Sequence, residues 1–195
     1  MANVLILGAN GGVARHATDL FLKVTQARLT LGLRNPSRLK NADPARIRVM
    51  ECDVLELEGL KKAMAGQDVV YANLAGDLER MARNIVKAMD ATGLKRLIFI
   101  SSMGIYDEVP GEKFGGILDP YRKSAAVIEA SDLDYTILRP AWFTQADEID
   151  YETTQKGQPF KGSQVSRKSV AALVVKLAES PGLEVRRSLG VSQPG

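Results

Sequence analysis

The sequence predicts an α/β fold, a doubly wound parallel sheet with helices on both faces, formed as a single domain over residues 1–195. Three observations support this prediction. Short apolar runs alternate with longer amphipathic segments along the first half of the chain. The first run, from Val4 to Leu7, is apolar without a break, which is typical of a strand buried on both faces. A length of 195 residues fits one domain with a full hydrophobic core.

The predicted strands are short and rich in aliphatic and β-branched residues, which pack well in a buried sheet. They cover residues 4–7, 28–33, 47–50, 68–72, 97–100 and 135–138, and a peripheral strand is expected at 148–153. The predicted helices repeat apolar residues every three or four positions. They cover residues 13–24, 56–65, 78–91, 121–131 and 169–179, and a short helical piece follows the turn at 35–37. The tail at 191–195 is expected to fray.

Composition excludes several classes of function. Lys and Arg number 26 against 23 Asp and Glu, and the basic residues are scattered, so we expect no nucleic-acid partner. Cys52 is the only cysteine and His16 the only histidine, which excludes an internal disulfide and makes a metal site unexpected. The start of the chain has no charged segment of the kind that opens a signal peptide, and no apolar stretch has membrane-spanning length. A cytoplasmic protein is expected, and its oligomeric state is left open.

A glycine-rich turn separates the first predicted strand from the first helix. Gly8, Gly11 and Ala14 match the spacing of the Rossmann-type dinucleotide-binding turn. There the first position favours a residue without Cβ, and the middle glycine lets backbone N–H groups approach a pyrophosphate. The alternative is a tight turn without a ligand. The residues of this turn predicted to bind the cofactor are Gly8, Asn10, Gly11, Gly12 and Val13.

The end of the second strand predicts which dinucleotide binds. An acidic residue at this point would bond the ribose 2′-hydroxyl of NAD, but the chain reads Leu33-Arg34-Asn35-Pro36. The planar guanidinium of Arg34 suits a 2′-phosphate, with Arg38 and Arg15 as helpers. Alternatively, these arginines are solvated surface charges. We therefore expect NADP(H) to be preferred over NAD(H).

Several further motifs lie at the predicted strand ends. These are Cys52-Asp53-Val54 after the third strand, Ile100-Ser101-Ser102 after the fifth, Leu133 to Pro140 through the sixth, and Val165-Ser166-Arg167 near the end. Together with the glycine-rich turn and Leu33 to Pro36, they make nearly the whole chain resemble the atypical short-chain dehydrogenase/reductase family, in particular its small NmrA-like, NAD(P)H-binding members.

The resemblance implies roles for residues that follow the strands, where ligands bind in open α/β sheets. Asp53 and Val54 would line the adenine. The segment Asn73-Leu74-Ala75 would run beside the adenosine ribose, and Ser101 and Ser102 would lie at the nicotinamide end. Lys123 would bond the nicotinamide ribose. The residues that would cover the nicotinamide ring include Pro140, Trp142 and Phe143.

The catalytic residues depart from the family pattern. Ordinary members place a tyrosine four residues before a lysine on one helical face, whereas Tyr121 lies only two residues before Lys123. Two residues correspond to about 200° on a helix, so both side chains reach one site only if the helix begins after Tyr121. Tyr106 is a second candidate phenol, and Tyr121 as a packing residue is an equal alternative.

The predicted catalytic set is therefore Ser102, Lys123 and Tyr121, in which the serine hydroxyl would orient a substrate oxygen. Serines after a strand also cap helices and turns, which is the alternative for Ser102.

The substrate side is expected at residues 103–118, a glycine-rich loop that could act as a lid, and at 141–165. Trp142 and Phe143 would stack an aromatic, flavin-like or quinone-like small molecule, or pack beneath the lid. The sequence predicts an NADPH-dependent oxidoreductase that reduces a small carbonyl, flavin or quinone. The alternative is a non-catalytic NADP(H)-binding redox sensor. A nucleotide-sugar epimerase or dehydratase fits less well, because little chain follows the sixth strand.

Overall fold

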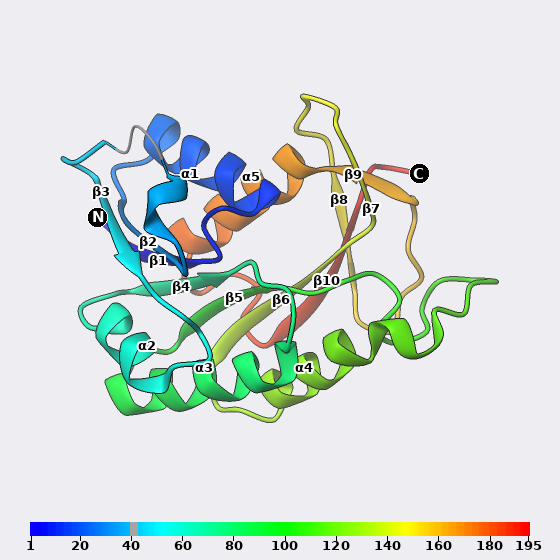
Figure 1. Cartoon of the computed structure of the whole chain (residues 1–195). Coiled ribbons are helices and arrows are strands. Elements are labelled where there is room, and N and C mark those ends of the chain that lie inside the picture. Colours follow the sequence, from blue (N-terminus) through cyan, green and yellow to red (C-terminus); the bar gives the residue numbers. More distant parts are fainter. Residues whose placement is uncertain (40–42) are drawn as a thin grey trace.

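The computed structural model describes residues 1–39 and 43–195. An eight-stranded sheet forms its centre, with helices on both faces (Figure 1). The strand order is β3-β2-β1-β4-β5-β6-β10-β8, and all neighbours are parallel except the edge pair β10–β8. In this order the strands are Ile47–Glu51, Arg28–Leu33, Asn3–Leu7, Val69–Ala72, Arg96–Ile100, Asp134–Pro140, Arg187–Ser192 and Glu152–Gln155.

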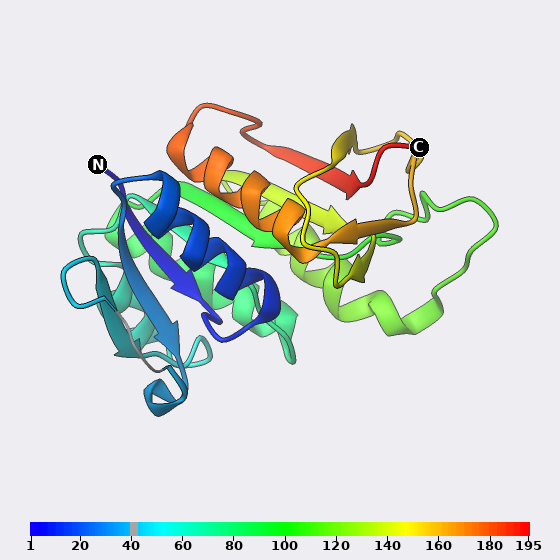
Figure 2. The ribbon, with the colours of Figure 1, turned by 90° about the horizontal axis from the view of Figure 1, so that it is seen from above.

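Two helix layers enclose the sheet. Helices α1 (Gly12–Val24) and α5 (Arg167–Glu179) lie side by side on one face. Helices α2 (Leu57–Met64), α3 (Leu78–Thr92) and α4 (Asp119–Glu129) cover the other face (Figures 1 and 2). The prediction of a doubly wound parallel sheet with helices on both faces is confirmed.

The first strand shows why both helix layers can form. Successive side chains of a strand point to opposite faces. Val4 and Ile6 join the apolar cluster beneath α1 and α5, whereas Leu5 and Leu7 join the cluster beneath α2, α3 and α4. All four side chains are fully buried, as the unbroken apolar run predicts.

The strand order reverses beside β1. From β1 the chain builds β2 and β3 on one side, then crosses to build β4, β5 and β6 on the other. Loops that leave β1 and β4 at their carboxyl ends therefore diverge and leave a crevice between them, which is where open α/β sheets bind ligands. The fold places the glycine-rich turn, which follows β1, at this crevice.

The C-terminal third differs from the prediction. Residues 191 and 192 do not fray: they belong to β10, where Val191 is fully buried and pairs with Pro140 on one side and Thr153 on the other. The peripheral strand begins at Glu152, four residues later than predicted, because its register is set by pairing with β10. Glycine is a weak strand former, so Gly190 weakens the strand pattern and the sequence alone does not predict β10.

A small parallel sheet, β7 (Trp142–Thr144) with β9 (Gln164–Ser166), was also not predicted. Its strands have only three residues each and pair across a long connection, so no local pattern marks them. This sheet lies at the same end of the molecule as the start of α5, which directly follows β9.

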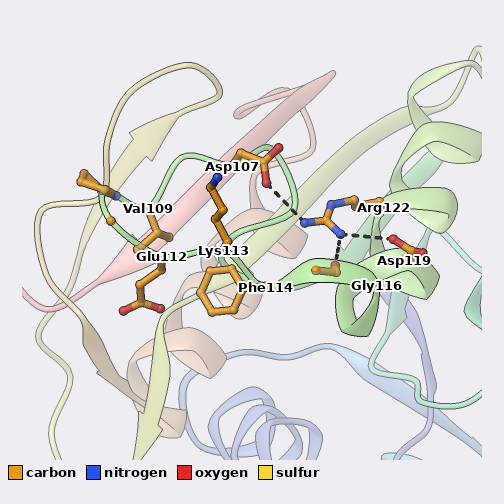
Figure 3. A pocket seen from close by; sticks show the side chains of 11 residues that line it. Asp107, Val109, Glu112, Lys113, Phe114, Gly116, Asp119 and Arg122 are labelled. Atoms are coloured by element: carbon orange, nitrogen blue, oxygen red, sulfur yellow. Dashed lines mark hydrogen bonds and ion pairs between the residues drawn. The ribbon is translucent and has the colours of Figure 1, made fainter.

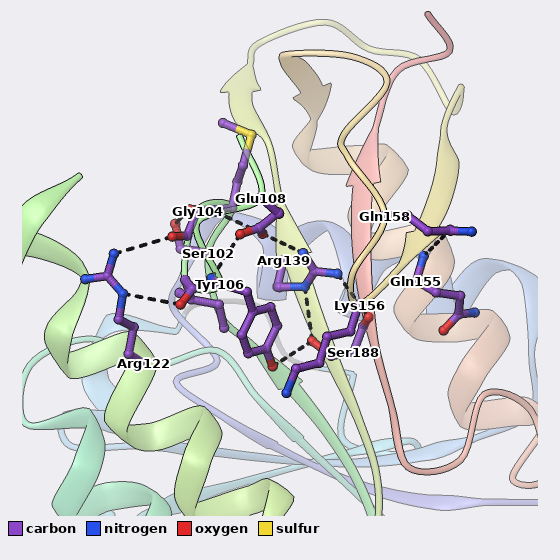
Figure 4. A network of polar contacts seen from close by, with 12 residues as sticks. Ser102, Gly104, Tyr106, Glu108, Arg122, Arg139, Gln155, Lys156, Gln158 and Ser188 are labelled. Carbon is purple, nitrogen blue, oxygen red and sulfur yellow. Dashed lines mark hydrogen bonds and ion pairs between the residues drawn. The ribbon is translucent and has the colours of Figure 1, made fainter. Parts of the chain in front are cut away.

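A buried ion pair holds the loop after β5 to the far half of the sheet (Figure 4). Arg139 in β6 is fully buried, and its Nη1 donates to Glu108 Oε1 at 2.5 Å, while Nε and Nη2 donate to the Ser188 hydroxyl and carbonyl oxygens of β10. The Glu108 carboxylate also accepts the backbone N–H groups of Gly104 and Tyr106. The base of the 103–118 loop is therefore fixed to β6 and β10.

Removing one partner of this pair should leave a buried, uncompensated charge. We expect Glu108→Gln to lower the free energy of unfolding by about 3 kcal/mol, measured by urea denaturation monitored by circular dichroism. The matched control is Glu112→Gln, an exposed carboxylate on the same loop, which should change stability by less than about 0.5 kcal/mol. Equal stability of the two variants would contradict the assigned role of the Arg139–Glu108 pair.

Candidate cofactor and active site

A cavity of about 550 Å³ opens at the carboxyl ends of β1, β2, β3 and β4. It is lined by Gly8, Asn10, Gly11, Leu33, Arg34, Asn35, Arg38, Cys52, Asp53, Val54, Asn73, Leu74, Ala75 and Met81. The predicted residues for the pyrophosphate turn, the 2′-phosphate, the adenine and its ribose thus come together. Gly12, Val13, Ser101, Lys123, Pro140, Trp142 and Phe143 lie outside this lining.

The glycine turn has geometry that larger residues cannot adopt. Gly8 has φ +74°, and a Cβ there would overlap the backbone carbonyl of Asn73. A Cβ on Gly11 would overlap the Asn73 side-chain amide. Gly11 is also the N-cap of α1 and supplies no side-chain hydrogen bond to the first turn. The helix therefore begins with N–H groups that no capping side chain satisfies, a suitable site for an anion.

Arg34 and Arg38 border the part of the cavity that follows β2. Both side chains are exposed, and within the described ranges neither forms an ion pair. Between them Asn35 caps the short 3₁₀ helix Pro36–Arg38 by accepting the Ser37 N–H and hydroxyl. This cap brings both arginines to the same end of the cavity.

Asp53 is partly buried in the cavity wall, and its Oδ1 accepts the Leu55 N–H at 2.9 Å. This local turn fixes the carboxylate and leaves Oδ2 free of hydrogen bonds among the described residues. The arrangement fits a carboxylate that accepts an exocyclic amine, as the family resemblance implies.

Two serines follow β5. Ser101 is buried, and its hydroxyl has no hydrogen-bond partner in the described part of the chain. Such an orphaned buried group is uncommon and indicates a missing partner. Ser102 donates its hydroxyl hydrogen to the Met103 carbonyl oxygen at 3.0 Å, so its own oxygen can still accept.

The structure separates Tyr121 from Lys123. Helix α4 begins at Asp119, before Tyr121, so both residues lie within the helix and point in different directions. Tyr121 packs against the apolar cluster between the sheet and α2, α3 and α4. Lys123 is exposed and lies near Glu79 of α3. The hydrogen bond from Arg83 is the main cause that lowers the pKa of Glu79, and the charge of Lys123 is a smaller cause. Tyr121 would reach the predicted site only if the helix began after it. The helix begins at Asp119 instead, with Pro120 in its first turn, so Tyr121 does not reach that site.

The side chain of Tyr106 points away from Ser102 and toward β10. Its hydroxyl contacts Glu129 at 2.8 Å and Ser188 at 3.1 Å, and Figure 4 shows the phenol pointing toward Ser188 and Lys156. Burial raises its pKa, which disfavours proton release. Tyr106 therefore belongs to the structural network around Arg139.

Apolar side chains gather beside the loop at 103–118. Trp142 and Phe143 are 59% and 40% exposed, and the rings of Phe114 and Trp142 lie 6.4 Å apart at an interplanar angle of 55°. The loop lines an open cavity of about 910 Å³, and Arg122 of α4 forms part of its wall (Figure 3). Arg122 donates to Asp119 and to the Gly115 carbonyl oxygen, so this cavity has a fixed wall.

Arg167 belongs to the Val165-Ser166-Arg167 motif, and the sequence predicts no role for it. The structure places its side chain against Gly12 at the start of α1. No signal in the sequence alone brings these two residues together, because they lie at opposite ends of the chain.

Among the described residues, no three His, Cys, Asp or Glu side chains form a cluster suited to a metal ion. None of the described helices has the length and apolar character needed to cross a membrane.

Comparison with protein families agrees with this geometry. Residues 8–181 match the family described as NAD(P)H-binding. The chain belongs to this NAD(P)H-binding family. The fold described above is the Rossmann fold, and the solved structures similar to this chain include Rossmann-fold NAD(P)-binding oxidoreductases of the atypical short-chain dehydrogenase/reductase type.

Two solved structures are similar over the whole chain. A Rossmann-fold NAD(P)-binding family protein from Shigella flexneri is 45% identical, with coverage of 100% of this chain and 95% of that chain and a TM-score of 0.91. A short-chain dehydrogenase/reductase from Veillonella parvula DSM 2008 in complex with NADP is 28% identical, with the same coverages and TM-score.

Quinone oxidoreductase 2 of Escherichia coli K12 is 23% identical over 146 residues, which cover 73% of this chain. The chain spans 35% to 49% of the length of the curated relatives it matches.

Cys52 lines the cavity at the glycine-rich turn but is not an activated thiol. Burial, and secondarily the charge of Asp53, raise its pKa from 9.0 to about 11. At pH 8 we expect native protein to react with iodoacetamide at least about 100-fold more slowly than the same protein in urea, because thiolate is the reacting form. Mass spectrometry of the only cysteine measures this rate directly.

The rate should rise steeply as pH approaches 11, and bound dinucleotide should lower it further. Labelling of the native protein as fast as a free thiol would contradict the raised pKa.

Proposed function

We propose that this chain is an NADPH-dependent oxidoreductase that reduces a small carbonyl, flavin or quinone by hydride transfer. The observation that supports it most is that Arg34 and Arg38, at the proposed adenosine end of the cavity, carry guanidinium groups with no ion-pair partner among the described residues. A 2′-phosphate carries the charge that these groups would neutralise, and the 2′-hydroxyl of NAD does not.

The residues present fit a dinucleotide along the whole crevice. Gly8 and Gly11 keep its centre free of side chains, and the first turn of α1 offers N–H groups to a pyrophosphate. The orphaned hydroxyl of Ser101 lies at the end of β5, where the nicotinamide half would bind. When bound there, NADPH would supply the hydride.

The substrate side consists of residues 103–118 and 141–165 in this proposal. The exposed aromatic rings of Trp142 and Phe143, together with the partly buried ring of Phe114, would hold a planar, apolar molecule by stacking. The similarity to a quinone oxidoreductase supports an acceptor of this kind. Flavins and quinones accept a hydride without a protein phenol, which suits a chain that lacks the paired tyrosine and lysine.

Ser102 would orient the acceptor oxygen by turning its hydroxyl hydrogen from the Met103 carbonyl oxygen, to which it donates here, toward that oxygen. Lys123 and Tyr121 remain in the proposed set with smaller roles. Lys123 is exposed and forms no ion pair among the described residues, and it would bond the nicotinamide ribose.

A non-catalytic NADP(H) sensor is the second candidate. The observation that favours it is the separation of Tyr121, packed against the core, from the exposed Lys123. A sensor would bind NADPH and NADP⁺ with different affinity and would turn over no acceptor.

Replacing Arg34 tests the cofactor choice. We expect Arg34→Gln to weaken NADPH binding by about tenfold or more, because a charge-assisted hydrogen bond to the phosphate is lost, while NADH binding changes little. Calorimetric titration with NADPH, NADH, NADP⁺ and NAD⁺ measures both effects. The control is Arg48→Gln, an exposed arginine of β3 outside the cavity, which should leave all four affinities unchanged. Equal losses for NADPH and NADH would contradict the phosphate assignment.

Turnover distinguishes the enzyme from the sensor. NADPH oxidation, followed by its near-ultraviolet absorbance, should occur with at least one member of a panel of quinones, flavins and small carbonyls. Ser102→Ala should then lower kcat by about 10²-fold, within the usual range for loss of a group that acts on the reacting oxygen. Tyr121→Phe should leave kcat within about twofold if the phenol only packs. Tight NADPH binding without turnover of any acceptor would favour the sensor.

A further inference from the structure

Arg167 lies where two helices begin. It is the first residue of α5, and its Cδ and Nε lie 3.0 Å from the point that a Cβ on Gly12 would occupy. Gly12 is the first residue of α1. The side chain of Arg167 therefore covers the start of α1, next to the glycine turn.

The guanidinium is held in place on one side only. Nη1 donates to the Thr144 carbonyl oxygen at 3.3 Å, and the guanidinium carbon lies 4.9 Å from the centre of the Phe143 ring. Nε and Nη2 make no hydrogen bond to the residues described in 1–39 and 43–195. Two donors of a planar fork thus remain available beside Gly12.

Positive charge accumulates at this point. Each helix start carries a partial charge of roughly +0.5, and neither α1 nor α5 has an acidic residue in its first turn. Lys168 is neutralised by Asp147 at 2.6 Å, and Arg15 bonds to Asn10. Arg167, in contrast, forms no ion pair with any side chain that the structure describes. An arginine at the positive end of its own helix is unfavourable unless an anion compensates it.

We infer that Arg167 is a positioning residue that holds the cofactor pyrophosphate against the first turn of α1, an inference that rests on the proposed dinucleotide site. The pyrophosphate would accept from Nε and Nη2 of Arg167 and from the α1 amides. Because the same guanidinium contacts Phe143 and Thr144, occupation of the crevice also fixes the aromatic segment that begins with Trp142. Cofactor binding and the substrate side are thereby connected through one side chain.

The competing explanation is that Arg167 only supports β7 through Thr144 and Phe143. The two explanations differ in which ligands depend on the residue. A pyrophosphate contact serves NADPH and NADH alike, because both contain this group, but does not affect adenosine 2′-monophosphate, which lacks it. A general structural defect would weaken all three ligands.

The test is calorimetric titration of the full chain and four variants with NADPH, NADH and adenosine 2′-monophosphate. We expect Arg167→Gln to weaken both dinucleotides by a similar factor, about tenfold or more, and to leave adenosine 2′-monophosphate within about twofold. Arg34→Gln should show the reverse pattern, with losses for NADPH and adenosine 2′-monophosphate only. Lys168→Gln, one position along the same helix, is the matched control and should resemble the unmodified chain.

The link to the substrate side has its own signal, because Trp142 is the only tryptophan. Saturating ADP-ribose contains the pyrophosphate but no nicotinamide ring to quench fluorescence directly. We expect it to change Trp142 emission in the unmodified chain and in Lys168→Gln, but not in Arg167→Gln. Arg167→Lys retains the charge and provides a second variant should the glutamine variant unfold. It should keep more dinucleotide affinity than Arg167→Gln.

The outcomes separate the inference from the proposed function. If the unmodified chain binds no dinucleotide, the proposed function fails. If it binds both dinucleotides and neither the glutamine nor the lysine variant of Arg167 changes their affinity, the inference is overturned while the proposed function stands. Equal losses for the dinucleotides and adenosine 2′-monophosphate would show a structural role and would also overturn the inference.

Discussion

The close approach of the β1–α1 turn to the end of β4 is the constraint on which the rest of the molecule depends. Gly8 and Gly11 contact Asn73 so closely that neither position has room for a Cβ. This contact brings the first turn of α1 to the point where the strand order reverses. The crevice, its free amide groups and the position of every ligand-facing loop follow from that packing.

Charge is arranged around this turn without internal compensation. Arg34 and Arg38 at one end and Arg167 near the start of α1 have no carboxylate partners among the described side chains, whereas Lys168 pairs with Asp147. Unpaired guanidinium groups around a crevice create a positive potential that favours an anionic ligand. A dinucleotide with an additional phosphate matches that distribution.

The proposed substrate side is built differently. The loop at 103–118 is fixed at its base by the buried pair of Arg139 and Glu108, whereas Trp142 and Phe143 beside it remain exposed. A rigid base with an open apolar surface can accept planar molecules of different outline, since stacking demands little directional precision. Arg167 contacts both this surface, through Phe143, and the cofactor turn, through Gly12.

The sequence by itself determined the alternating strands and helices, the glycine turn and many of the residues that line the cavity, because each depends on local patterns: an unbroken apolar run at Val4 to Leu7, or an arginine directly after a strand. Only the tertiary structure decided the rest. The strand β10, the packing of Tyr121, the separation of Lys123 and the contact of Arg167 with Gly12 all depend on pairings between distant segments. Such pairings are set by register and by which faces become buried together, and no short stretch of sequence records them.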